Sequence, residues 1–289
     1  MIADLLLDPF ADFAFMRRAL VGCLALALGS APVGVFLMLR RMSLTGDAMA
    51  HAILPGAAVG YLVAGLSLGA MTLGGVIAGL AVALLAGAVS RSTALREDAS
   101  LAAFYLISLA AGVLIVSMRG GTVDLMHVLF GTVLALDDAA LTLLCAIATL
   151  TLITLAALFR PLVLECVDPG FLRSVGGGGA VAHFVFLALA VLNLVGGFHA
   201  LGTLMAVGIM ILPAVAARFW ARGIGGLIAV AAGIAILSGW AGLLLSFHVG
   251  LPSGPAIILV AGAAYLGSLV LGPEGGLVAR LAPRPHFEN

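Results

Sequence analysis

The chain has 289 residues, of which 63% are hydrophobic and 9% charged, with a mean hydropathy of +1.28 and a formal net charge of zero. This composition excludes a soluble globular domain and is typical of a multi-pass membrane protein. All thirteen basic residues are arginine, so the chain has neither a Schiff-base lysine nor the phosphate-binding lysine of a P-loop, and it cannot bind ATP in that way by itself.

Nine apolar runs follow one another along the chain, each close to the ~20 residues that a helix needs to cross the hydrocarbon of a bilayer. They predict an all-α fold in which residues 1–289 form a single transmembrane domain, a polytopic bundle of about eight or nine helices. The expected spans are 19–39, 47–66, 69–90, 99–118, 139–160, 180–198, 201–218, 224–246 and 255–272. The connections near residues 67 and 200 are short, so either neighbouring pair can also be one broken or re-entrant element.

Arginine placement predicts the orientation of these spans. If the N-terminus lies outside, ten of the thirteen arginines fall in cytoplasmic segments, as the positive-inside rule requires. The ten are Arg40, Arg41, Arg91, Arg96, Arg160, Arg173, Arg218, Arg222, Arg280 and Arg284, and the other three are Arg17, Arg18 and Arg119. One span more or fewer in the first half would place the N-terminus inside.

The second expected span begins with an acid and a histidine, Asp47 and His51, in a sequence otherwise suited to lipid. Because they are four residues apart, they share one face of a helix and lie one turn from each other, close enough to hold a single ion. Pro55 cannot donate a hydrogen bond to the His51 carbonyl, which leaves that oxygen free beside the two side chains. Asp47 also fits the N-cap of the span, and capping does not exclude metal binding.

Two loops are long enough to carry function. The outer loop, 119–138, contains Asp124, His127, Asp137 and Asp138, and its acids favour cations at the entrance. Its apolar centre can lie in the membrane interface or plug an outer vestibule. The inner loop, 160–179, is polar and ends in four glycines, which predicts a short cytoplasmic helix on a flexible tether.

The run R-R-M-S-L-T-G-D-A-M-A-H-A-I-L-P-G at 40–56 resembles the signature of bacterial ABC-transporter permeases for zinc and manganese. Three further stretches agree in order: R-E-D-A-S at 96–100, D-L-M-H-V-L-F-G at 124–131 and A-L-G-T-L-M-A-V-G-I-M-I-L-P-A-V-A-A-R at 200–218. V-D-P-G-F-L-R-S-V-G at 167–176 resembles the cytoplasmic coupling segment that sits on the ATPase.

The resemblance implies the membrane-spanning permease of an ATP-driven metal importer, acting as a homodimer in the bacterial inner membrane. It implies separate cytoplasmic ATPase subunits and a periplasmic metal-binding protein as partners, without nucleic acid or a permanently bound cofactor, and the chain itself is then not an enzyme. In the inner loop, the groups expected to meet the ATPase are Glu165, Asp168 and Arg173. The four glycines at 176–179 depart from the family pattern, which leaves open how rigidly this loop transmits motion.

The resemblance also implies a transported divalent ion, for which a carboxylate and a neutral imidazole are suitable ligands. A twofold axis would bring a second Asp47 and His51, giving four ligands in an N2O2 set. We expect zinc first and manganese next, with iron also open, because the same ligands serve all of them. His199, near the outer end of the sixth span, and His127 are further candidates, although a histidine in a solvated loop is the commoner case.

Two other classes of protein stay open. A proton-coupled secondary transporter would use Asp47 and His51 as its relay and would need no ATPase. An intramembrane hydrolase is the remote alternative, because the chain has no H-E-x-x-H and Ser253 lacks a G-x-S-x-G frame. Two further residues receive structural interpretations: Asn193 is expected to hydrogen-bond a neighbouring helix, and His183 to be wetted near a membrane interface.

Overall fold

The structure is a computed structural model that describes residues 2–65, 67–118, 133–168, 171–172 and 178–281. Its apolar helices are α2 (Ala14–Leu39), α3 (Ser43–Ala64), α4 (Leu68–Ser92), α5 (Glu97–Met118), α7 (Asp138–Ala157), α10 (Gly179–Leu201), α11 (Thr203–Ala217), α12 (Ile224–Val249) and α13 (Ser253–Leu271). Within the described residues, seven of these are long and apolar enough to cross a membrane, and α5 and α11 supply shorter apolar stretches. Each expected span coincides with one helix, which confirms the all-α bundle.

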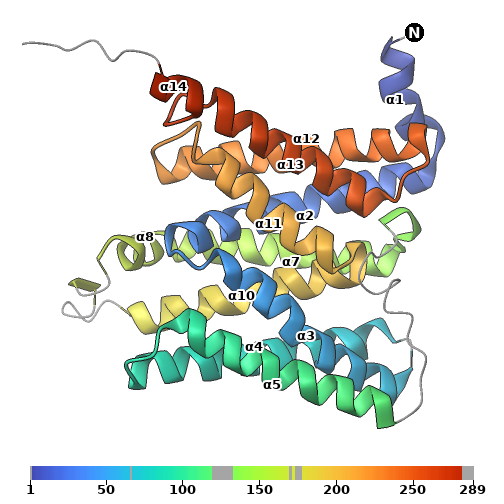
Figure 1. Ribbon diagram of the computed structural model, residues 1–289. Helices are drawn as coiled ribbons and strands as arrows, with labels where there is room; N and C mark the ends of the chain where they lie inside the picture. The colour runs from blue at the N-terminus through green and yellow to red at the C-terminus, as the bar shows by residue number, and fades with distance from the viewer. Residues whose placement is uncertain (1, 66, 119–132, 169–170, 173–177, 282–289) are drawn as a thin grey trace, which may run out of the picture.

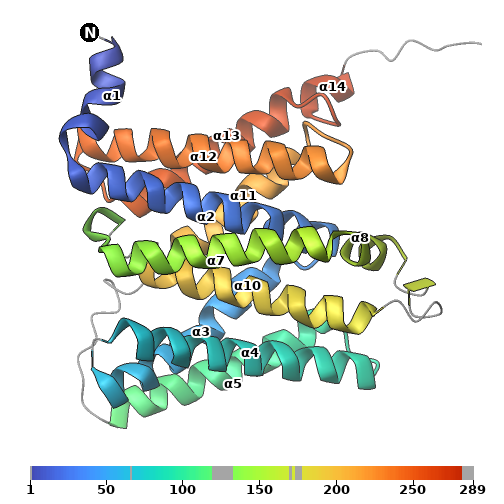
Figure 2. The same cartoon turned by 180° about the vertical axis from the view of Figure 1, so that it is seen from behind.

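The helices pack into two groups that share α2 and α10. One group places α2 against α7, α11 and α12, with α13 against α11 and α12, and the other places α3 against α4 and α5 (Figure 1). The view from behind has α7 in front and α3 behind α10 (Figure 2). Helix α3 therefore lies on the opposite face of the bundle from α7.

Four short elements join or extend the bundle: α1 (Ile2–Asp12), η1 (Val133–Ala135), α8 (Phe159–Val167) and α14 (Leu277–Leu281). Helix α8 is the short helix that the inner loop predicts. The other three were not expected, because a search for ~20-residue apolar runs does not detect helices this short.

The two short connections differ from each other. Helices α3 and α4 are joined by a turn at Gly65, whose φ of 63° is left-handed, and the Ser67 side chain then caps α4. Only Gly202, at φ 91°, separates α10 from α11, and α11 has 15 residues. At ~1.5 Å per residue α11 is about 22 Å long, shorter than the ~30 Å hydrocarbon core. The α10–α11 junction thus fits the broken element considered above, whereas residue 66 of the α3–α4 connection lies outside the described residues.

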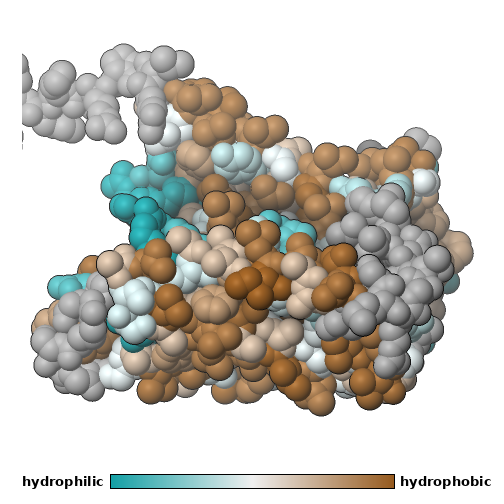
Figure 3. Space-filling view, turned by 60° about the horizontal axis from the view of Figure 1, so that its bottom comes forward, coloured by the Kyte–Doolittle hydropathy of each residue, from teal (hydrophilic) through white to brown (hydrophobic). Residues whose placement is uncertain are grey.

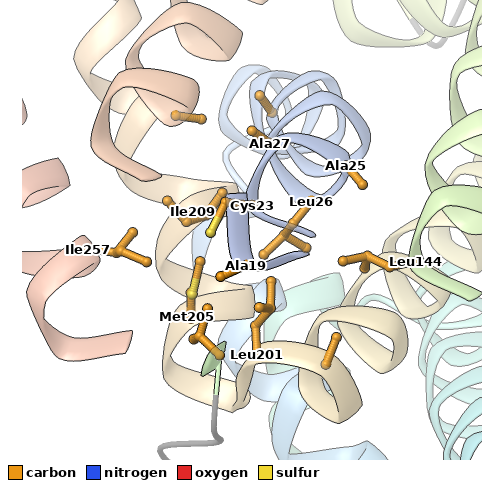
Figure 4. Packing of buried hydrophobic residues seen from close by; sticks show 14 of the residues in the cluster. Ala19, Cys23, Ala25, Leu26, Ala27, Leu144, Leu201, Met205, Ile209 and Ile257 are labelled. Atoms are coloured by element: carbon orange, nitrogen blue, oxygen red, sulfur yellow. The ribbon is translucent and has the colours of Figure 1, made fainter. Parts of the chain in front are cut away.

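Helix α2 lies at the centre of the first group. Its Cys23 and Leu26 are buried beside Met205 and Ile209 of α11, with Ile257 of α13 completing the cluster (Figure 4). Lipid is as apolar as these side chains, so close van der Waals packing rather than exclusion of water holds such helices together. The core therefore depends on how closely the helices approach.

Glycines set that approach at two helix crossings. A Cβ at Gly34 of α2 would overlap the Met210 carbonyl oxygen of α11, and one at Gly56 of α3 would overlap the Gly74 carbonyl oxygen of α4. In both places backbone meets backbone, as in small-residue contacts between membrane helices. The crossing at Gly56 fixes α3, which carries Asp47 and His51, onto α4.

The Asn193 interpretation is confirmed. Its amide nitrogen donates to the Thr151 hydroxyl at 2.7 Å, joining α10 to α7, and also to the Leu189 carbonyl at 2.9 Å. Gly29 of α2 faces the Asn193 amide oxygen, where a Cβ would come within 2.5 Å of it. A buried polar side chain thus obtains its partners inside the bundle.

Candidate functional site

Asp47 lies one turn inside helix α3. The helix begins at Ser43 with Met42 at the N-cap position, and no side-chain hydrogen bond caps it. The N-cap interpretation of Asp47 is therefore wrong, because its backbone is already helical. The helix starts four residues earlier than expected, since Ser43, Leu44, Thr45 and Gly46 join it. Capping therefore does not account for the carboxylate.

Asp47 and His51 face each other, as their spacing predicts. The His51 Nε2 and an Asp47 carboxylate oxygen are 3.8 Å apart, too far for a hydrogen bond. Two ligands ~2.1 Å from one ion at a tetrahedral angle lie about 3.4 Å apart. A small side-chain movement would bring both atoms to that separation, so the pair can hold one ion between them.

The pair lies on a face of α3 that the rest of the described chain leaves open. The Asp47 side chain is 65% exposed and that of His51 38% exposed, and Leu44, one turn earlier, is 81% exposed. His51 lies about 12 Å along the helix at ~1.5 Å per residue. Insertion scales put an aspartate at a helix centre at about 2.5–3.5 kcal/mol in lipid, so these groups need a protein or aqueous neighbour.

Helix α5 supplies the contacts on the other side of this segment. The Tyr105 and His51 rings stack with centroids 6.2 Å apart and planes at 30°. The Ser108 hydroxyl lies 3.3 Å from the Ala52 carbonyl, to which it donates. Pro55 is buried, and a Cβ at Gly112 of α5 would come within 2.5 Å of its ring. Tyr105 was not among the expected site residues, because only the packing of α5 against α3 brings it to His51.

The described residues of one chain contain no cluster of three or more His, Cys, Asp or Glu that could hold a metal. Asp124 and His127 lie outside the described residues. The backbone of His199 lies in the last turn of α10, and its side chain is outside the described part. The metal roles of His127 and His199 therefore stay predictions, and Asp47 with His51 is a two-ligand set in a single chain.

Two acids of the outer loop have structural partners. The Asp137 carboxylate caps α7 by accepting from the Ala140 amide at 2.7 Å, with the residue at the N-cap position. Asp138 pairs with Arg18 of α2 at 3.0 Å. Asp137 thus caps the start of α7, and Asp138 ties that start to α2.

The opposite end of the bundle, at the left in Figures 1 and 3, is hydrophilic. Arg41, Arg160, Arg218 and Arg222 are exposed there, at the ends of α2 and α11 and on α8. All four belong to the ten arginines that the positive-inside rule assigns to the cytoplasmic side. The remaining surface in Figure 3 is mostly apolar, as a lipid-facing surface requires.

Helix α8 is tied to this end by two arginines of neighbouring spans. Arg91 of α4 lies 3.7 Å from Glu165, whose side chain is only 13% exposed. Arg40 contacts Cys166 and His183, with 2.9 Å between its guanidinium and the His183 Nδ1. Burial raises the pKa of the Cys166 thiol. The interpretation of His183 as a wetted interface residue is wrong, because it is 5% exposed and packs against Arg40.

The predicted coupling residues separate into different environments. Asp168 is exposed, and its carboxylate accepts from the Phe171 amide at 2.9 Å. Glu165 points into the chain toward Arg91. Arg173 and the first two glycines of 176–179 lie outside the described residues, while Gly178, at φ 70°, precedes α10. Asp168 is therefore the described member of the set that is available to a partner.

Comparison with known proteins identifies the family. The model of the ABC 3 transport family matches residues 12–272, nearly the whole chain. The chain belongs to the ABC 3 transport family. It is therefore a permease subunit of an ABC transporter, a multi-pass protein of the inner membrane and not an enzyme, which confirms the expected class.

Individual relatives span the full bundle. The chain is 30% identical to a manganese transport system membrane protein MntC from Halalkalibacterium halodurans, over 94% of this chain and 92% of that protein. It is 28% identical to the manganese import system permease protein ScaB from Streptococcus parasanguinis, over 93% of this chain and 94% of that protein. It is 27% identical to the chelated iron transport system membrane protein YfeD from Yersinia pestis, over 93% of this chain and 89% of that protein.

Solved structures share the fold. PsaBC from Streptococcus pneumoniae in complex with Fab matches with a TM-score of 0.83 at 25% identity, over 98% of this chain and all of that chain. An inward-facing ABC transporter of the metal-chelate type matches with a TM-score of 0.68 at 17% identity, over 87% of this chain and 84% of that chain. The second likeness is one of fold alone.

Proposed function

We propose that this permease carries a divalent transition-metal ion into the cell, with manganese as the first candidate. The observation that carries the proposal is the Asp47–His51 pair, 3.8 Å apart on an open face of a membrane helix. A carboxylate and an imidazole suit manganese, iron and zinc, while carboxylate oxygen favours the harder manganese ion. The names of MntC and ScaB support manganese, and this changes the order expected from the sequence, which placed zinc first.

We propose that a second copy of the chain covers this face. Asp47 and His51 are too exposed for lipid, and a twofold axis beside α3 would bring four such side chains together. Two carboxylates and two imidazoles would then surround the ion without forming a site within one chain. Such a shared set assembles and opens as the copies move, which suits a transported ion better than a closed structural site.

We expect a different partner protein to bind at each end of the bundle. Cytoplasmic ATPase subunits would dock at the hydrophilic end around α8, where exposed arginines and Asp168 lie. A periplasmic metal-binding protein would deliver the ion at the opposite end, at the start of α7. ATP hydrolysis belongs to the separate subunits, and no nucleic acid or resident cofactor has a part in this scheme.

Uptake of radioactive manganese into proteoliposomes tests this function. The permease, co-purified with its ATPase subunits, is expected to accumulate Mn(II) only when ATP and the metal-binding protein are supplied, with Mg(II) failing to compete. Stimulation of ATP hydrolysis by Zn(II) but not Mn(II) would place zinc first. Uptake driven by a pH gradient without ATP would favour the proton-coupled alternative and contradict the proposal.

The Asp168 side chain offers a test of coupling. Because its carboxylate both carries charge and accepts from the Phe171 amide, Asp168→Asn separates the two roles: asparagine keeps the acceptor and removes the charge. If charge docks the ATPase, Asp168→Asn and Asp168→Arg should both lower metal transported per ATP hydrolysed, roughly threefold or more at ~0.7 kcal/mol of lost pairing. Exposed Asp8→Asn at the other end is the control, and unchanged coupling in Asp168→Arg would count against the docking role.

A further inference from the structure

Three contacts from α5 follow the segment of α3 that holds His51. Tyr105 stacks on the His51 ring, Ser108 donates to the Ala52 carbonyl, and Gly112 lies against the Pro55 ring. The three α5 residues are spaced by three and four positions, so they form one helical face. That face meets α3 at His51, Ala52 and Pro55.

This segment of α3 needs support, because Pro55 lacks an amide hydrogen. The His51 carbonyl loses its donor four residues later, and proline inside a helix weakens or bends it at this point. Helix α5 holds the segment from outside: Ser108 bonds the adjacent Ala52 carbonyl at 3.3 Å, and Gly112 lies close against the Pro55 ring. The backbone that positions the His51 side chain is therefore held by α5.

The imidazole itself has few other constraints. It is 38% exposed, its Nε2 is not hydrogen-bonded to Asp47 at 3.8 Å, and the stacked ring of Tyr105 is the aromatic contact described for it. Centroids 6.2 Å apart and planes at 30° fall within the range of favourable offset stacking. The stack fixes the plane of the imidazole while leaving the edge that carries Nε2 directed at Asp47.

We infer that Tyr105 is a positioning residue for metal capture: its ring holds the His51 imidazole in the orientation that lets Nε2 and the Asp47 carboxylate bind one ion. This inference rests on the proposed function of the pair. Tyr105 is half-buried, so its ring is not enclosed by the core and can be replaced without creating an internal cavity. The hydroxyl has no part in the stack, and phenylalanine should serve equally well.

Mn(II) binding by the purified full-length permease in lipid nanodiscs tests the inference. Electron paramagnetic resonance gives the affinity, and nitrogen hyperfine coupling reports whether imidazole binds the metal. Tyr105→Leu and Tyr105→Met are expected to weaken Mn(II) about tenfold, since partners that orient a metal ligand typically contribute 10–100-fold, and to reduce the nitrogen coupling. Tyr105→Phe should stay within about twofold of the wild type. Ile107→Ala, two residues further along α5 on a side chain that is 65% exposed, leaves the His51, Ala52 and Pro55 contacts in place and is the control.

The outcomes separate this inference from the site on which it rests. If wild-type nitrogen coupling is present and disappears in His51→Ala, but Tyr105→Leu and Tyr105→Met bind like the wild type, the site stands and the positioning role is overturned. If both variants fail to elute as folded protein, Tyr105 is a packing residue and the inference is also overturned. If the wild type shows no nitrogen coupling, both the site and the inference fail.

Discussion

Replacing Asp47 with asparagine is expected to reduce Mn(II) transport at least a hundredfold while leaving the permease folded. The carboxylate is 65% exposed in the single chain, so the substitution disturbs no packing, but it removes the charged ligand that faces His51. Partners that only orient a ligand already contribute 10–100-fold to metal binding, so a direct ligand should contribute more. Initial rates of uptake into proteoliposomes measure the effect.

His51→Ala should match this loss, and the double variant should be no worse than either single one. Groups that act on one ion as a unit are strongly non-additive, because removing one ligand already abolishes the site. Asp8→Asn, which neutralises an exposed acid on α1, is the control for charge alone. Independent, additive losses from Asp47 and His51 would contradict a shared ion, and wild-type uptake in either variant would remove that residue from the pathway.

A valine at position 34 is expected to prevent stable folding. A Cβ at Gly34 would overlap the Met210 carbonyl oxygen, and neither backbone can move without separating α2 from α11. Overpacking of cores costs about 1–3 kcal/mol when side chains can adjust, and here the obstacle is main chain, so the cost should exceed that range. Net stabilities of about 5–15 kcal/mol leave little reserve. Size-exclusion chromatography and thermal unfolding in detergent should show loss of the monodisperse species.

Gly233→Ala is the control for Gly34→Val. Gly233 lies within α12, and a Cβ there has no neighbour within 4 Å. Gly233→Ala should be neutral or stabilising by up to about 1 kcal/mol, since alanine is the better helix former. If Gly34→Val unfolds at the same temperature as Gly233→Ala, the close crossing of α2 and α11 does not exist as described.

Hydropathy was enough to find the spans, because each helix carries its own apolar signal. It was not enough for the short helix α1, or for the start of α3 at Ser43, where Ser43, Leu44, Thr45 and Gly46 join the helix ahead of the expected span. Asp47 therefore lies one turn inside helix α3 and not at its N-cap. A local pattern cannot reveal such a boundary when the deciding contacts come from other helices.

Contacts between residues on different helices were harder to predict than contacts within one helix. The spacing of Asp47 and His51 was sufficient to place them together, because both lie on one helix. Tyr105 reaches His51 only because α5 packs against α3, and His183 is buried because Arg40 ends a distant helix beside it. Such contacts depend on which helices are neighbours, and a single sequence does not contain that information.

Because the α3 face that carries Asp47 and His51 is open in a single chain, two copies are expected to share one ion between these side chains. The number of metal ions bound per dimer is the decisive measurement. Equilibrium dialysis of the purified dimer against Mn(II), followed by elemental analysis, should give one ion per two chains, and none in Asp47→Ala or His51→Ala. Two ions per dimer, or one ion that persists in the double variant, would contradict the shared site.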